Sequence, residues 1–275
     1  MQSLSEQLFL TRQPIKAKLV SRHEISGLTH LLQNQTRAVH TGYYLRAIAT
    51  QILQVQYQYL HIGVMGDPIV LSYGDSIIRN SDLDILNSCQ WLNDQIIGFF
   101  FEFCQIEKFL GSNFCFVGPE VAQFLKMVSQ NEIGIFLEPL GLSSKTAVFL
   151  PVNSMTDPTK AGGSHWSLLV FLKTNNLFIH FDSCEGSNRS EAKILANKVG
   201  KYLSPELQLN FLELGATQQV NGYDCGIHCI ANAQNIAEHL KSGNEIHDLK
   251  KVEQTTVSEF RKNLVTLIRS LSSPR

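Results

Sequence analysis

From residue 67 onward, apolar residues recur with two spacings, and these predict helices and strands in a mixed order. Apolar positions three and four apart predict amphipathic helices, and short apolar runs between turn-forming residues predict strands. The predicted helices are 91–105, 119–127, 190–203, 225–240 and 252–271. The predicted strands are 69–73, 114–117, 146–152, 166–172, 177–181 and 209–214. Because helices precede and follow a central group of strands without a repeating βαβ unit, the pattern predicts an α+β fold with a central antiparallel sheet flanked by helices.

Residues 1–64 differ in composition from the rest of the chain. They carry six lysines or arginines against two glutamates. Such an acid-poor segment is typical of organelle transit peptides, but it also fits an extension that is poorly ordered or loosely attached. We expect the second, although 43–60 holds enough apolar residues for a helix. The sequence therefore predicts an extension at 1–64 and one compact domain at 65–275.

The charge and apolar content of the chain limit its classes of function. Of 275 residues, 44% are hydrophobic and 17% are charged, which is typical of a globular protein. The formal net charge of −1 gives no overall electrostatic basis for binding nucleic acid. No apolar run reaches the roughly 18–20 residues of a membrane-spanning helix. We therefore expect neither nucleic acid nor a membrane as a partner.

The cysteines indicate a reducing compartment. An even number of them could form disulfides, but the chain is apolar enough to build its own core and shows no clear secretory signal. We expect free thiols and a location in the cytoplasm and/or the nucleus. The six are Cys89, Cys104, Cys115, Cys184, Cys225 and Cys229.

Cys225 is the cysteine whose surroundings best suit a nucleophile. The reactive form of cysteine is the thiolate, which a helix N-terminus and a neighbouring imidazolium stabilise. Cys225 follows the turn sequence NGYD and precedes Gly226 and the predicted helix 225–240. Amide groups at a helix start would also face an oxyanion there.

A histidine should act as the base, and three are candidates. His165 follows the glycine-rich sequence AGGS and directly precedes the strand 166–172, so little backbone bulk would crowd its ring. His180 lies within the strand 177–181, and His228 lies on the helix of Cys225. The residues alone favour His165 but leave all three open.

Asp182 and Gln219 complete the candidate set. If 166–172 and 177–181 form a hairpin about Asn175 and Asn176, His165 and Asp182 become cross-strand neighbours, and Asp182 can orient the imidazole. A register shift of one residue would separate them. Gln219 lies six positions before Cys225, and its amide could stabilise an oxyanion.

A metal site is the competing interpretation of one cluster. Cys225, His228 and Cys229 lie on one predicted helix, but a zinc site needs a second pair of ligands, and the sequence offers none. We predict no metal and no cofactor.

Four sequence motifs surround these residues. They are WLND at 91–94, AGGSHWSLLV at 161–170, FIHFDS at 178–183 and QQVNGYDCG at 218–226. Together they resemble the ubiquitin-like-specific, or sentrin-specific, protease family. The order His, Asp, Gln, Cys matches that family, whereas papain has its cysteine first. DPIVLSYGDSIIRNSDLDIL at 67–86 and FLEPL at 136–140 resemble the deneddylating members. The resemblance selects His165 as the base.

The resemblance implies a papain-like, ubiquitin-like-protease fold and a thiol protease that cleaves after the C-terminal Gly-Gly of a ubiquitin-like modifier. In this family two tryptophans enclose that tail, and Trp91 and Trp166 stand at the matching positions. Flat indoles would admit glycine and exclude residues with a Cβ. Asp94 matches the residue that contacts the basic tail of the modifier.

The resemblance further implies deneddylation, in which a Nedd-type modifier is released from conjugates and its precursor is processed. The implied partners are that modifier and its cullin-type conjugates, and we expect the enzyme to be a monomer. Two alternatives remain open: a SUMO-specific protease, and a non-catalytic protein that binds a ubiquitin-like modifier. The set of Cys225, His165, Asp182 and Gln219 argues against the second.

Overall fold

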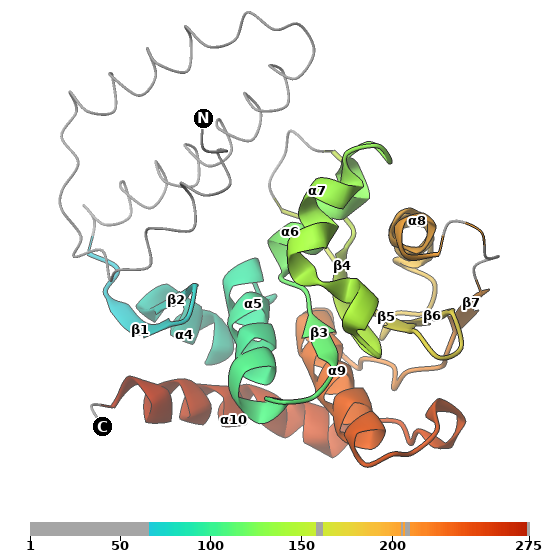
Figure 1. The fold of residues 1–275 in the computed structure, drawn as a ribbon. Helices are drawn as coiled ribbons and strands as arrows, with labels where there is room; N and C mark the ends of the chain where they lie inside the picture. Colours follow the sequence, from blue (N-terminus) through green and yellow to red (C-terminus); the bar gives the residue numbers. More distant parts are fainter. Residues whose placement is uncertain (1–65, 158–161, 205, 207–209, 274–275) are drawn as a thin grey trace, which may run out of the picture. The chain divides into compact units, whose positions relative to one another are not determined.

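A five-stranded sheet forms the centre of the structure (Figure 1). This computed structural model describes residues 66–157, 162–204, 206 and 210–273. The strand order is β3-β4-β5-β6-β7. The strands are β3 (Phe114–Phe116), β4 (Ala147–Asn153), β5 (Trp166–Leu172), β6 (Leu177–Phe181) and β7 (Asn210–Glu213). The predicted extension at 1–64 and its possible helix lie outside the described residues.

The sheet is mixed, whereas the sequence predicts an antiparallel one. β5 is antiparallel to both β4 and β6. β3 is parallel to β4, and β7 is parallel to β6. Helices connect the strands of each parallel pair, because a parallel pair needs a long crossover. The expected antiparallel pairing is correct for the three central strands and wrong for both edge strands.

Helices cover both faces of the sheet. Those of the described chain are α4 (Asn80–Leu86), α5 (Asp94–Phe103), α6 (Pro119–Met127), α7 (Ile133–Leu137), α8 (Arg189–Leu203), α9 (Cys225–Lys241) and α10 (Gln254–Ser272), with the short turns η1 (Cys104–Lys108), η2 (Glu138–Leu140), η3 (Leu142–Ser144) and η4 (Ile246–Asp248). α6, α7 and α8 cover one face, α5 and α9 cover the other, and α10 packs against α9 (Figure 1). The predicted α+β class with flanking helices is confirmed.

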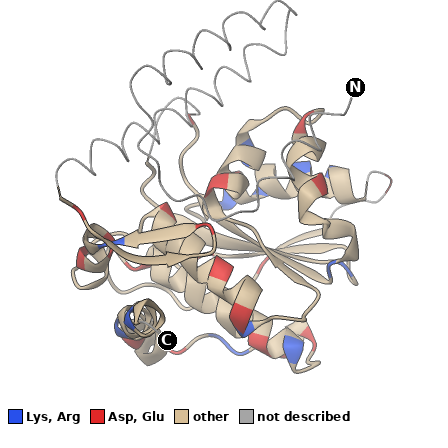
Figure 2. Ribbon diagram, turned by 60° about the vertical axis from the view of Figure 1, so that its left-hand side comes forward, with Lys and Arg blue, Asp and Glu red and all other residues tan. Residues whose placement is uncertain are grey.

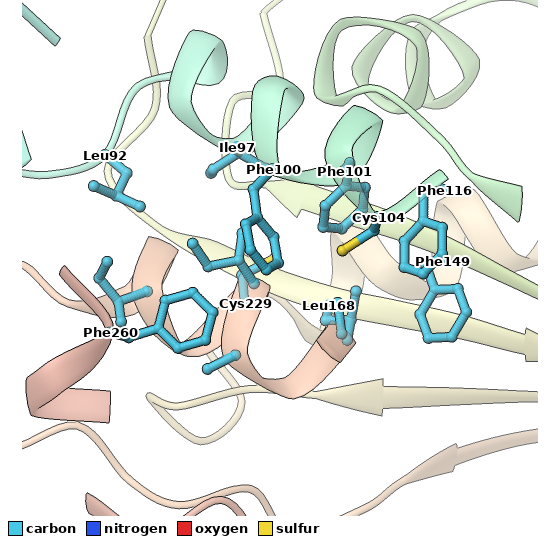
Figure 3. Packing of buried hydrophobic residues seen from close by; sticks show 14 of the residues in the cluster. Leu92, Ile97, Phe100, Phe101, Cys104, Phe116, Phe149, Leu168, Cys229 and Phe260 are labelled. Carbon is cyan, nitrogen blue, oxygen red and sulfur yellow. The ribbon is translucent and has the colours of Figure 1, made fainter. Parts of the chain in front are cut away.

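Alternate side chains of the strands β3 to β6 enter two separate cores. In β4, Phe149 faces the core beneath α5 and α9, and its neighbours Val148 and Leu150 face the core beneath α6 and α8. Figure 3 shows the first of these cores, where the rings of Phe116 and Phe149 stack with their centroids 4.5 Å apart. Because both faces are buried, the sheet holds the ends of β5 and β6 firmly.

The helix predicted at 91–105 begins later, at Asp94. The side chain of Asn93 caps it, since Asn93 Oδ1 accepts the backbone N–H of Ile96 at 3.0 Å. Trp91 and Leu92 therefore lie outside the helix, on the segment that joins α4 to α5. This cap places both residues next to the start of α9, as described below.

A two-stranded hairpin precedes α4. β1 (Ile69–Tyr73) is the strand predicted at 69–73, and it pairs antiparallel with β2 (Ser76–Arg79). The sequence does not predict β2, because its four residues pass directly into α4 and are too few to show a pattern.

Most charged residues of the described chain lie on its helices and loops. Figure 2 shows acidic and basic residues interspersed there, whereas the strands β3 to β6 carry none. Among the described helices, none is both long and apolar enough to cross a membrane.

Candidate active site

The hairpin of β5 and β6 brings His165 and Asp182 together. In its register Leu168 faces Phe181, so Asp182 lies one diagonal step from His165 at the end of the hairpin. The distance from His165 Nε2 to Asp182 Oδ1 is 2.6 Å. The turn at Asn175 and Asn176 sets this register, as the sequence predicts.

Asp182 is a buried carboxylate with a full set of donors. Its Oδ1 also accepts the backbone N–H of Cys184, and its Oδ2 accepts that of Asn188, each at 3.0 Å. Burial would raise the pKa of Asp182, but the hydrogen bonds from His165 and from these two amides outweigh it and lower the pKa. Asp182 therefore remains ionised and orients the imidazole of His165.

His165 is held between Asp182 and Cys225. Burial alone would lower its pKa, but the hydrogen bonds with Asp182 and Cys225 raise the pKa well above its ordinary value of 6.5. An imidazolium beside a cysteine stabilises the thiolate. The pair thus has the chemistry of an activated nucleophile.

The backbone of His165 is fixed from the preceding loop. The backbone N–H groups of Ser164 and His165 donate to Ser154 Oγ at 2.9 and 3.2 Å. Gly163 has a φ of +134°, and a Cβ there would lie 1.9 Å from Asn153 Oδ1. Only glycine fits this approach, which explains the glycine-rich sequence before the histidine.

Cys225 is the first residue of α9 and is buried. The next residue, Gly226, packs so closely that a Cβ there would lie 2.8 Å from Leu92 Cβ. The start of α9 therefore lies directly against the segment that carries Trp91. Helix-start amides at Cys225 are also suitably placed to stabilise an oxyanion.

The two competing histidines are engaged elsewhere. His180 Nε2 lies 2.9 Å from Ser167 Oγ and its Nδ1 lies 3.4 Å from Glu213 Oε1. His228 is buried, and neither of its ring nitrogens meets a hydrogen-bond partner among the described residues. Burial lowers the pKa of both rings. Of the three candidates, the geometry therefore places His165 at Cys225.

The cluster considered for a metal does not converge in the described chain. Cys229 Sγ donates to Ser167 O at 3.2 Å. Within the described ranges, no group of three or more His, Cys, Asp or Glu side chains could hold a metal ion. All six cysteines fall within the described residues and are free thiols.

Both tryptophans make hydrogen bonds near the start of α9. Trp166 begins β5 and is buried, and its Nε1 donates to Leu92 O at 3.0 Å. Trp91 is 50% exposed, and its Nε1 donates to Gly222 O at 2.6 Å. A half-exposed indole beside a candidate nucleophile offers an apolar surface for a ligand.

Asp94 is exposed at the first position of α5, near Trp91 in sequence. Its Oδ1 accepts the backbone N–H of Gln95 at 3.1 Å, which leaves the rest of the carboxylate available to a basic ligand.

Gln219 lies in the loop before Cys225, and its backbone N–H donates to Ser183 O, just after the end of β6, at 2.9 Å. Its Oε1 accepts from Ser183 Oγ at 2.8 Å, and its Nε2 donates to Asn221 O at 2.7 Å. An amide nitrogen has two hydrogens, so one remains for an oxyanion. Two hydrogen bonds therefore orient the side-chain amide of Gln219, and its role as an oxyanion donor stays a prediction.

Asn188 is a buried residue of the site that the sequence analysis missed. Its Nδ2 donates to Val152 O at 3.0 Å and to Ser167 Oγ at 3.1 Å, while its backbone N–H donates to Asp182. An asparagine before a helix is typical of an N-cap, and Asn188 does precede α8. No sequence signal shows that its side chain turns inward to tie β4 and β5 to Asp182.

Replacing Asn188 by alanine should destabilise the fold by about 2–3 kcal/mol, because buried acceptors lose their donor. Urea unfolding measures this loss. Asn197→Ala, an exposed position on α8, serves as the matched control and should change stability by no more than about 0.5 kcal/mol. Equal stability of the two variants would contradict the role assigned to Asn188.

Comparison with known proteins assigns the family. Residues 90–272 match the family described as the Ulp1 protease family, C-terminal catalytic domain. The chain belongs to the Ulp1 protease family. Sentrin-specific protease 8 of Rattus norvegicus is 41% identical over 210 residues, which cover 75% of this chain and 96% of that protein. NEDD8-specific protease 1 of Arabidopsis thaliana is 36% identical over 217 residues, which cover 75% of this chain and 95% of that protein.

Solved structures show the same fold. The C-terminal Ulp1 protease domain in complex with Smt3, the yeast ortholog of SUMO, has a TM-score of 0.59 at 17% identity, covering 75% of this chain and 89% of that one. The expected ubiquitin-like-protease fold is confirmed, and this Ulp1-family chain is a cysteine protease.

Proposed function

We propose that this Ulp1-family protease is a deneddylase, which cleaves after the C-terminal Gly-Gly of NEDD8 in conjugates and in the precursor. The observation that carries the proposal is the junction of Cys225, His165 and Asp182 at the start of α9. Relatives of 36% to 41% identity, matched over nearly their whole length, bear the names sentrin-specific protease 8 and NEDD8-specific protease 1. Those names support NEDD8 as the modifier.

The first half of the reaction forms a thioester. Cys225 Sγ attacks the carbonyl carbon of the terminal glycine, and the oxyanion receives hydrogen bonds from the Cys225 N–H and the Gln219 amide. The imidazolium of His165 then gives its proton to the departing amine as the C–N bond breaks. The carboxylate of Asp182 holds the ring at the correct angle throughout.

The second half releases the modifier. His165, now neutral, takes a proton from water, and the hydroxide attacks the thioester carbonyl. Cys225 leaves as the thiolate, and the free carboxyl terminus of the modifier departs.

Selectivity for the tail follows from the residues around Cys225. In the proposed complex the tail lies against the exposed indole of Trp91 and near the buried indole of Trp166, where only a tail without side chains fits. Asp94 pairs with a basic residue of the modifier.

The decisive experiment compares two modifiers on the full chain. NEDD8 and SUMO, each linked through its terminal glycine to a fluorogenic amine, are hydrolysed side by side. We expect kcat/KM for NEDD8 to exceed that for SUMO by at least about 10²-fold, since the wrong tail leaves charged groups unpaired. A preference for SUMO would refute the modifier assignment.

A second substrate series tests the tail path separately. NEDD8 that ends in Gly-Ala should be hydrolysed at least about tenfold more slowly than NEDD8 that ends in Gly-Gly, because a Cβ meets the indoles. Binding of NEDD8 without hydrolysis of either tail would instead support a non-catalytic binding protein.

The proposal also covers the substrates, the oligomeric state and the location of the enzyme. The substrates are cullin-type conjugates of NEDD8, the enzyme acts as a monomer, and it works in the cytoplasm and/or the nucleus. The motifs shared with deneddylating proteases support the substrate class. Sedimentation equilibrium of the purified chain tests the monomer directly.

A further inference from the structure

One arginine of the C-terminal helix reaches the loop that ends at the nucleophile. Arg261, on α10, donates from Nε to Asp224 Oδ1 at 2.8 Å and from Nη2 to Tyr223 O at 3.3 Å. Asp224 directly precedes Cys225. The side chains of Arg261 and Asp224 are each only 11% exposed, so this ion pair is largely shielded from solvent.

The same guanidinium also holds the segment that carries Trp91. Nη1 of Arg261 donates to Ile85 O at 3.0 Å, and Nη2 donates to Gln90 O at 2.6 Å. Gln90 directly precedes Trp91, and the indole Nε1 of Trp91 donates to Gly222 O in the loop before Cys225. Arg261 and Trp91 thus join the two segments at two separate points.

A chain of hydrogen bonds extends from Arg261 to the candidate oxyanion donor. Asp224 Oδ2 accepts from Asn221 Nδ2 at 2.7 Å, and Asn221 O accepts from Gln219 Nε2 at 2.7 Å. Asn221 Oδ1 accepts the backbone N–H of Tyr223 and that of Asp224, both at 3.0 Å. The orientation of the Gln219 amide therefore depends on the loop that Arg261 anchors.

The geometry requires the planar fork of arginine. The guanidinium meets one carboxylate and three carbonyl oxygens from two segments, and it also lies over the ring of Tyr223, with 5.4 Å from Cζ to the centroid. A lysine ammonium has three donors at a single point and cannot span this set.

We propose that Arg261 is a positioning residue that fixes the Trp91 segment and the loop 219–224 in one relative arrangement. This role rests on the proposed function, because the tail must lie under Trp91 while its carbonyl meets Cys225 and Gln219. Arg261 itself need not touch the substrate. It acts through Asp224 and Gln90 on groups that do.

The test substitutes Arg261→Lys, which keeps the charge and removes the fork. Arg269→Lys, an exposed position on the same helix, is the matched control. Each variant is assayed with fluorogenic NEDD8 for kcat and KM, and Cys225 is alkylated with iodoacetamide and quantified by mass spectrometry. Both assays are run well below the unfolding midpoint measured for each variant.

Arg261→Lys should lower kcat/KM on the order of 10²-fold, with a lower kcat and a higher KM, because misplacement by about 1 Å costs this much. Its Cys225 should also be alkylated more slowly, while Arg269→Lys stays within about twofold of the unchanged protein in both assays. Asp224→Asn, which retains the shape of the acceptor, should lose kcat/KM by about tenfold through the same loop.

Three results would overturn the role of Arg261. One is a kcat/KM for folded Arg261→Lys within about threefold of the unchanged protein. Another is a change confined to KM with kcat and alkylation intact. If Arg261→Lys does not fold, an unaltered kcat and KM of Asp224→Asn would also overturn the role of Arg261. Failure of the unchanged protein to hydrolyse NEDD8 would refute the proposed function instead. The alkylation rate of Cys225 in Arg261→Lys, compared with the unchanged protein, would still test the role of Arg261.

Discussion

Cys225→Ala should abolish the hydrolysis of fluorogenic NEDD8, with a fall in kcat on the order of 10⁶-fold, as expected when a covalent nucleophile is removed. The reaction proceeds through a bond to Cys225 Sγ, and no other described cysteine shares a hydrogen bond with His165. Because the tail path and Asp94 remain, the variant should still bind NEDD8. Stopped assays with high enzyme concentration measure the residual rate, and calorimetry measures the binding.

The two exposed cysteines provide the control for this prediction. Cys89→Ala and Cys184→Ala remove thiols that lie on the surface, and each should retain kcat within about threefold. Residual turnover of Cys225→Ala above about 1% of the unchanged rate, in protein free of contaminating enzyme, would contradict its role as nucleophile.

Asp182→Asn should lower kcat by about 10⁴-fold while leaving the fold intact. The amide has nearly the shape of the carboxylate, but it can donate a hydrogen bond to Nε2 of His165 and thereby favour the wrong tautomer. It also removes a charge that stabilises the imidazolium. Asp84→Asn, an exposed position on α4, is the matched control and should be nearly neutral.

The pH dependence of the reaction also tests the contact between Asp182 and His165. Burial opposes the charge of His165, and the hydrogen bonds with Asp182 and Cys225 raise its pKa above 6.5. Asp182→Asn removes the carboxylate that raises the pKa of His165, so this pKa falls. The imidazolium then loses its proton at lower pH and can no longer protonate the departing amine, so the alkaline limb of the residual kcat/KM should move to lower pH. An unchanged limb would contradict the coupling of Asp182 to His165.

Local patterns were sufficient to predict the catalytic hairpin. β5 and β6 have the bounds that the sequence predicts, because each is a short apolar run closed by an asparagine turn. The edge strands were different. The apolar runs of β3 and β7 show that they are strands, but their direction depends on how the chain returns through helices, which no local pattern records.

The residues of the site likewise divide into those that local sequence patterns indicate and those that they do not. Cys225 could be predicted from its own neighbours, since a turn and a helix start are local signals. The choice of His165 over His180 and His228 needed the resemblance, because no local pattern shows which side chains surround a histidine. In the structure His180 is engaged by Ser167 and Glu213.

Positioning residues could not be predicted from the sequence. Asn188 meets Val152 across 36 positions, and Arg261 meets Gln90 across 171. Each appears in the sequence as an ordinary helix-start or helix-surface residue. Their function arises only when distant carbonyl groups converge on one side chain.

The most direct test of the central claim is a covalent trap. NEDD8 with a C-terminal electrophile in place of its last glycine is incubated with the full chain beside the matching SUMO probe, and the modified peptide is identified by mass spectrometry. We expect one adduct, on Cys225, formed with the NEDD8 probe and suppressed in Asp182→Asn. An adduct on another cysteine, or faster labelling by the SUMO probe, would contradict it.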